Sequence, residues 1–270
     1  MSVQKVIDNA KALSNINSFD VQISSAGYVK ADDGWRQIPL YAGFTRLYYV
    51  MDGEGFILSD TEKMKLEPGF VYLAPCGMKC GYYTDTSISK LFFHVNLPLF
   101  EDEIDAFESY GRFARLPIDV GKIEKMTEAY LGDDILDHLW LKSEITSTVC
   151  AFLAENRSSI RKNEEQRPVR DAMRYIRTHL DSALTVKMVA EVALCSESKL
   201  NALFKREVGN SVAGYIEDLI MSEAHNMLLS RDATIAEISE ALGFCDQFYF
   251  SRRFKKRFGL SPREYRLKVK

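Results

Sequence analysis

The sequence predicts an α+β protein in which a β-rich front half precedes an all-helical back half. Three observations carry this prediction. Short runs of β-branched and aromatic residues, separated by Gly and Pro turns, extend to about residue 97; helical periodicity begins near Asp119; and two similar cap, helix and turn units follow Pro168. A chain of 270 residues with 46% apolar residues is long enough for two ordinary domains.

The front half contains the predicted strands. They are VQISSAGYV (21–29), LYYVMDGEGFIL (47–58), GFVYLAP (69–75) and KLFFHVNL (90–97). Tight-turn dipeptides such as Asp52-Gly53 and Pro68-Gly69 separate them. Several short strands with this spacing predict an antiparallel sandwich or barrel over about residues 20–115.

Residues 119–155 are predicted to form a helical hairpin. The first helix has an apolar face and can stop at Gly132, and the second runs over about 133–156. The second helix carries an apolar stripe: Leu141, Ile145, Val149 and Phe152. That stripe either docks on the barrel or pairs two copies of the chain. The polar stretch 156–167 is predicted to be a linker between a first domain, 1–155, and a second, 168–270.

The second domain contains the same helical unit twice. In the first unit Thr185 caps a short helix and Ser196 caps a longer one; in the second, Thr234 and Asp246 take these places about 50 residues later. Each unit is therefore predicted to be a helix-turn-helix motif. A helix over 211–230 joins them, and twenty residues would span roughly 30 Å, close to the separation of recognition helices on one side of a DNA duplex.

The longer helix of the second unit is predicted to have one apolar and one DNA-binding face. Phenylalanines at 250, 254 and 258 lie on the apolar face. The predicted DNA-binding residues are Phe248, Tyr249, Arg252, Arg253 and Lys256. Arg252 is the best candidate for a base contact, because a guanidinium can bond both O6 and N7 of guanine. Lysines and Arg257 in the following turn are expected to meet phosphates.

The first unit has a weaker DNA-binding face. Its candidates are Ser198, Lys199, Asn201 and Lys205. Ala202 lies near the centre of this face and offers only a methyl group. Lys199 and Asn201 are left open as base readers or as phosphate contacts.

Charge and composition limit the remaining possibilities. From residue 168 onward there are 17 Lys and Arg against 13 Asp and Glu, and before it 18 against 25, so the formal charge of −3 averages an acidic and a basic half. No apolar run is long enough for a membrane span, and the N-terminal residues do not resemble a secretory signal, so we expect a cytoplasmic protein. Five cysteines show no disulfide or metal-site spacing.

Residues 235–266 resemble the signature of the AraC/XylS family of bacterial transcription regulators. The matching positions include Gly243-Phe244, Arg252, Gly259 and Ser261-Pro262. The resemblance covers about residues 168–268 and implies two helix-turn-helix subdomains that bind promoter DNA in consecutive major grooves. It further implies a homodimer that contacts RNA polymerase, with activation favoured over repression. Leu194 departs from the family pattern, in which a glycine is frequent at this turn.

The front half resembles the cupin-type sensing domains that many of these regulators carry. Turn residues such as Asp52-Gly53 and Pro75 to Gly77 carry this resemblance. No His-x-His pair occurs, and Cys80 stands where a later metal-binding His would be, so we predict neither metal nor cofactor and no enzyme activity. The residues available for a small organic effector are Trp35, Arg46, Tyr49, Tyr82, Phe93 and His94. Tyr48 and Tyr49 are exclusive alternatives because neighbours alternate across a strand, and Trp35 could instead lie on the surface.

The sequence therefore predicts a promoter-binding regulator controlled by a small molecule, first of all a sugar or related metabolite. Two other interpretations stay open: a constitutive regulator whose barrel only dimerises, and a metal-dependent cupin enzyme fused to a DNA-binding domain.

Overall fold

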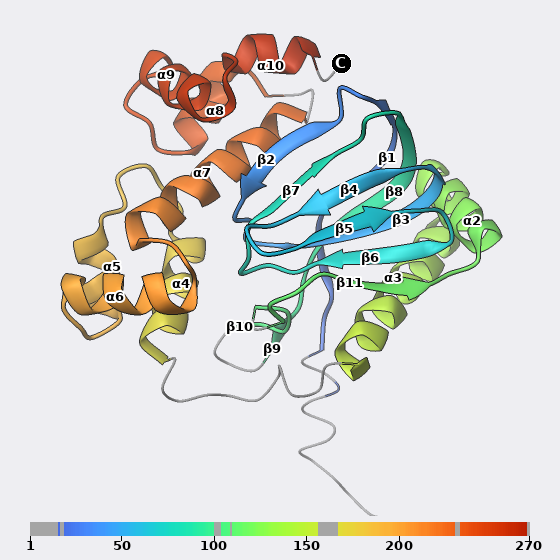
Figure 1. Cartoon of the computed structure of the whole chain (residues 1–270), viewed down its shortest axis with the longest axis horizontal. Coiled ribbons are helices and arrows are strands. Elements are labelled where there is room, and N and C mark those ends of the chain that lie inside the picture. The colour runs from blue at the N-terminus through green and yellow to red at the C-terminus, as the bar shows by residue number, and fades with distance from the viewer. Residues whose placement is uncertain are drawn as a thin grey trace, which may run out of the picture.

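A computed structural model of the chain describes residues 16, 19–99, 104–108, 110–155, 167–229 and 233–268. It confirms the α+β class: a β domain lies beside an all-helical domain, with two further helices on the opposite side of the β domain (Figure 1). Among the described residues, no helix is long and apolar enough to cross a membrane.

Two antiparallel sheets face each other and form a flattened barrel. The larger sheet has the order β1-β8-β3-β6-β11 and the smaller β2-β7-β4-β5. The larger sheet comprises β1 (Gln22–Asp32), β3 (Thr45–Gly53), β6 (Phe70–Ala74), β8 (Ser87–Asn96) and β11 (Ala114–Pro117). The smaller comprises β2 (Arg36–Leu40), β4 (Gly55–Leu58), β5 (Lys63–Leu66) and β7 (Cys80–Tyr83). A short ribbon pairs β9 (Pro98–Leu99) with β10 (Ile104–Asp105).

The predicted strands are confirmed, and the strands that the sequence analysis did not predict are short or polar. Four such strands are RQIPL in β2, KMKL in β5, CGYY in β7 and ARLP in β11. In β2, β5 and β11 exposed residues interrupt the buried ones, and β7 is only four residues long, so none of them gives a strong strand pattern.

The helical hairpin covers the outer face of the larger sheet. It consists of α2 (Val120–Leu131), which Asp119 caps and which ends at Gly132 as predicted, and α3 (Ile135–Glu155). The predicted stripe on α3 is buried in one cluster with the outward-facing residues of β3, β6 and β8. This stripe therefore docks on the barrel, the first of the two alternatives for it.

The helical domain is built around one long helix. It contains α4 (Arg167–Thr178), α5 (Val186–Val192), α6 (Glu197–Glu207), α7 (Val212–Leu229), α8 (Ile235–Ala241), α9 (Gln247–Phe258) and α10 (Pro262–Lys268). Helix α7 matches the predicted joining helix to within one residue at each end. Figure 1 shows it running from α5 and α6 to α8 and α9 along the side of the barrel.

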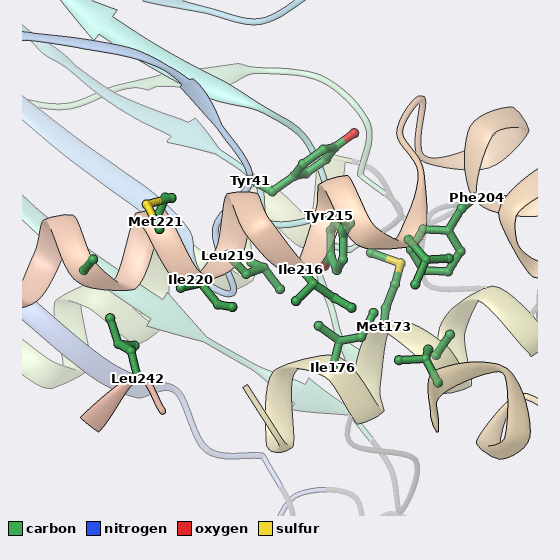
Figure 2. Packing of buried hydrophobic residues seen from close by; sticks show 14 of the residues in the cluster. Tyr41, Met173, Ile176, Phe204, Tyr215, Ile216, Leu219, Ile220, Met221 and Leu242 are labelled. Carbon is green, nitrogen blue, oxygen red and sulfur yellow. The ribbon is translucent and has the colours of Figure 1, made fainter. Parts of the chain in front are cut away.

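A single hydrophobic core unites both helix-turn-helix units. Residues from α4 to α9 share this core, and Figure 2 shows Ile216, Leu219 and Ile220 of α7 at its centre with Ile176 of α4 below them. The two units are thus held in one fixed arrangement rather than tethered by a free connector. The predicted linker falls at 156–166, outside the described residues, apart from Arg167, which begins α4.

Candidate nucleic-acid interface and effector site

Four capping side chains set the starts of the helices in the two units. Thr185 and Ser196 accept hydrogen bonds from backbone N–H groups at the starts of α5 and α6, as predicted. Thr234 forms a capping box with Glu237 at α8, and Asp246 accepts from two backbone N–H groups at α9. The hydrogen bonds that Asp246 accepts, above all the one from the backbone N–H of Tyr249, hold the pKa of its carboxyl below the usual value. The caps fix the direction in which α6 and α9 leave their turns.

Helix α9 has the two faces that its sequence predicts. Phe250 and Phe254 are fully buried, and their ring centroids lie 5.8 Å apart. On the opposite face Phe248 is 68% exposed and Tyr249 40% exposed. Arg252 and Lys256 are exposed beside them. This face joins two exposed cations to two exposed aromatic rings, which suits contact with phosphates and base edges.

Arg253 does not belong to that exposed face. Its guanidinium forms an ion pair with Glu217 of α7 and lies 5.3 Å from the ring centroid of Phe244. Arg257, which was expected to meet a phosphate, pairs instead with Asp218 of α7 at 2.6 Å. Both arginines therefore hold α9 against α7, because the acidic residues of α7 face them.

Helix α6 presents a smaller exposed set. Ser198, Lys199 and Lys205 are exposed as predicted. Asn201 is half-buried: its Oδ1 accepts from the backbone N–H of Val212 at 3.1 Å, and its Nδ2 donates to the carbonyl of Glu197. Asn201 thus provides the acceptor for the first backbone N–H of α7. This hydrogen bond occupies a side chain that was a candidate for contact with the bases.

Four of the six predicted effector residues line the barrel interior. Arg46 on β3 and His94 on β8 occupy one rung of the sheet and are 3% and 8% exposed. Trp35 is not on the surface but stacks on Tyr82 of β7, with ring centroids 4.4 Å apart and planes at 17°. These residues come from both sheets and converge on one interior.

Tyr49 and Phe93 do not reach this interior. Both point from the larger sheet toward the helical hairpin, where they are buried in the cluster formed with α2 and α3. Their prediction as effector contacts is wrong, because strand alternation assigns them to the face opposite Tyr48 and Arg46. Of the exclusive pair, Tyr48 is the one inside.

Lys90 and the aromatic residues around it also line the interior, although they were not among the predicted effector residues. Lys90 is only 2% exposed, and its Nζ lies 3.6 Å from the ring centroid of Tyr48 and 4.9 Å from that of Phe92. Phe44 stacks on His94 at 4.1 Å. Alternation along β8 carried the missing signal: Lys90, Phe92 and His94 fall at every second position and so share one face.

In the part of the chain that the structure describes, no three His, Cys, Asp or Glu side chains converge in a way that could hold a metal ion. Cys80 is fully buried in the barrel interior, and burial raises the pKa of its thiol. The residues present therefore do not fit a cupin-type metal site.

The barrel and the helical domain meet along β2, the loop after it and α7. Tyr41 leaves the barrel and joins the core of the helical domain, where its ring lies 5.0 Å from that of Tyr215 and its hydroxyl donates to the carbonyl of Val208 (Figure 2). Arg177 of α4 pairs with Glu108 of the β domain at 2.9 Å, with 15% and 8% of the two side chains exposed. Buried contacts of this kind fix the two domains relative to each other.

Two helix-turn-helix units on one rigid core, with a basic and aromatic face on the second, define a DNA-binding transcription regulator. Residues 189–268 match the family model described as a helix-turn-helix domain. Along the whole chain, the sequence is similar to the Msm operon regulatory protein of Streptococcus mutans, 23% identical over 94% of this chain and 95% of that protein. The arabinose operon regulatory protein of Escherichia coli is 42% identical over 99 residues, which are 36% of this chain and 34% of that one.

The fold has a solved counterpart. The structure of an apo single-residue variant of ToxT from Vibrio cholerae superposes with a TM-score of 0.65, over 94% of this chain and 98% of that one, at 14% identity. This likeness shows a common fold of a β domain followed by a helix-turn-helix domain. The matched residues and the relatives over 40% identical place the helix-turn-helix domain in the AraC/XylS family of regulators.

Proposed function

We propose that this protein is a transcription activator whose N-terminal barrel binds a small organic effector and thereby changes how the helix-turn-helix domain sits on promoter DNA. It acts in the cytoplasm as a homodimer that contacts RNA polymerase. Sugar-operon regulators among the relatives, and the structure of an unsaturated fatty acid bound to ToxT, support control by a small molecule.

One observation carries the proposal: the barrel is in direct buried contact with the helix that joins both DNA-binding units. Tyr41 and the pair Glu108–Arg177 attach the β domain to α7 and α4. A ligand that favours one barrel conformation therefore changes the energy of this contact, which is how an effector biases a two-state equilibrium.

The DNA-binding part is tested by selecting duplexes from a random library with the full chain. Enrichment of a sequence with two half-sites about one helical turn apart is expected, since two recognition helices read consecutive major grooves. A library that stays random after selection would contradict sequence-specific binding.

The control part is tested with a reporter gene driven by the selected site. In Glu108→Gln the buried Arg177 loses its charged partner, so we expect transcription to change without effector and its response to effector to shrink. Glu54→Gln, which alters an exposed pair with Lys65, is the matched control and should behave as wild type. An unchanged response in Glu108→Gln would remove this contact from the mechanism.

Dimerisation is proposed through the exposed end of the helical hairpin. Four large apolar side chains there are 59–69% exposed: Leu131, Ile135, Leu136 and Leu139. A second copy of the chain would cover them. Leu139→Glu should lower the mass measured by analytical ultracentrifugation toward the monomer, whereas an unchanged mass would place the dimer contact elsewhere.

A further inference from the structure

Three basic side chains meet inside the barrel on one face of the larger sheet. Arg46 and His94 share one rung, and Lys90 lies four residues before His94 on β8, two alternations along the same face. All three are buried, with 3%, 8% and 2% exposed. The barrel therefore concentrates positive charge in its interior.

No acidic side chain among the described residues balances this charge. Arg46 Nη1 and His94 Nδ1 are buried without a hydrogen-bond partner, and no side-chain hydrogen bond or ion pair of the three basic groups is found among the described residues. The contacts of Lys90 are with ring faces of Tyr48, Trp35 and Phe92. Burying a charge without a counter-charge is costly, so such a cluster needs an anion to be stable as cations.

In the ligand-free protein this cost lowers the pKa values of Lys90 and His94. Burial first, and then the Arg46 charge, hold the pKa of Lys90 well below its usual range. The same two causes, with Lys90 in addition, lower the pKa of His94. The strand register, which puts the three groups on one buried face, is what makes them available to one ligand.

We propose that the effector carries an acidic group, a carboxylate or a phosphate, that binds between Lys90 and Arg46. This inference rests on the proposed effector function and names the chemical class of its ligand. A guanidinium and an ammonium on one face of the barrel interior supply the hydrogen bonds and charge that such a group accepts. The ring faces of Trp35, Tyr82 and Phe92 form the walls against which the rest of the molecule packs.

The position of the site gives the anion a route to the DNA-binding domain. His225 of α7 is 4% exposed, and after burial the charge of Arg46 is what lowers its pKa, to about 4. His225 in turn contributes to the lowered pKa of His94 on β8. Because Arg46 acts on His225, an anion that binds beside Arg46 would change the electrostatic environment of α7 at the domain contact that the proposed control mechanism uses.

The test compares four probes on the full chain by isothermal titration calorimetry. They are glucuronate, glucose 6-phosphate, hexadecenoate and neutral glucose. At least one acidic probe is expected to bind more than tenfold tighter than glucose, and the comparison of carboxylates with the phosphate ester decides which acidic group the site takes. Binding should fall at least tenfold in Lys90→Met.

Lys63→Met is the matched control. Lys63 is an exposed lysine whose Nζ also lies over aromatic rings, 4.0 Å from Phe56, but outside the barrel interior. Its affinity for the acidic probe should equal that of wild type. Lys90→Met should melt at a higher temperature than wild type without ligand, because it removes a buried amine that has no polar partner among the described residues.

The outcomes separate this inference from the proposed function. Binding of glucose alone, with equal affinity in Lys90→Met, would overturn the acidic effector while leaving control by a small molecule intact. An acidic probe that binds but leaves the affinity for the selected DNA unchanged would support the site and contradict control. Binding of none of the four would overturn both.

Discussion

The two helix-turn-helix units share a plan but differ at the turn between their helices. Leu194 in the first unit and Gly243 in the second occupy equivalent positions, and both have positive φ, 51° and 71°. Leu194 is 92% exposed, whereas a Cβ on Gly243 would lie 2.1 Å from a carboxylate oxygen of Asp181. The first turn faces solvent and tolerates a side chain at a conformational cost. The second packs against the side chain of Asp181, which would have to move to admit one.

The units also differ in their cores and outer faces. Phe250, Phe254 and Phe258 of the second correspond to Leu200, Phe204 and Val208 of the first. Outside, Tyr249 and Arg252 correspond to Lys199 and Ala202. We therefore expect the second unit to supply most of the base contacts and the first mainly to contact the DNA backbone.

The largest effect is expected from truncating the two cores. Phe254→Ala should lower the free energy of unfolding by about 3–5 kcal/mol, since Phe254 is fully buried. Phe204→Ala should cost less, because Phe254 packs on three rings (Phe250, Phe258 and Tyr265) and Phe204 on that of Tyr215. Urea unfolding measures both, and equal losses would argue that the aromatic core gives the second unit no advantage.

The difference in base reading is tested next. Arg252→Ala should weaken binding to the selected DNA by about 1–3 kcal/mol and relax specificity at one base pair. Arg252→Lys keeps the charge but not the bidentate fork, so it should recover phosphate attraction without specificity. Fluorescence anisotropy on matched and randomised duplexes measures this; equal loss on both would make Arg252 a phosphate contact.

Glycine is expected to affect stability in opposite ways at the two turns: losing it should destabilise the second turn, and introducing it should stabilise the first. Gly243→Ala should destabilise the protein by roughly 1–3 kcal/mol, because the added methyl meets Asp181 and the backbone is left-handed. Gly209→Ala, with φ of 75° and nothing within 4 Å, is the control for the backbone part alone and should cost about 1 kcal/mol.

Leu194→Gly should have the opposite sign. Relief of the left-handed strain should raise stability by about 0.5–1 kcal/mol, after allowance for the freer unfolded chain. Ala202→Gly, at an exposed position inside α6, should instead lose about 1 kcal/mol. Thermal melts would decide, and a lower melting temperature for Leu194→Gly would show that its side chain stabilises the turn.

The smallest expected difference concerns phosphate contacts. Lys256→Ala in the second unit and Arg206→Ala in the first change exposed cations at equivalent positions. Each should reduce the slope of log affinity against log salt by about 1, with little change in sequence preference. A reduced slope in only one of the two variants would show that the units do not grip the duplex alike.

Much of the helical domain could be predicted because its determinants are local. All four caps, the repeat, and the buried position of Phe250 and Phe254 follow from residue type and spacing. The candidate effector site was harder to predict: Trp35, Arg46, Tyr82 and His94 face the interior, but Tyr49 and Phe93 do not. Strand alternation relates neighbours to one another, yet the sequence does not mark which of the two faces is enclosed when both are apolar.

By itself the sequence determined the order of the two domains, the paired helix-turn-helix units and the exposed basic face of α9, because periodicity and capping act over a few residues. Only the tertiary structure decided that Arg253, Arg257 and Asn201 serve packing around α7, that Tyr41 enters the helical core, and that Lys90 lies buried on the same face as Arg46. These outcomes depend on which residues distant in the chain meet, since a side chain's partner, unlike its local conformation, is set by the packing of whole elements.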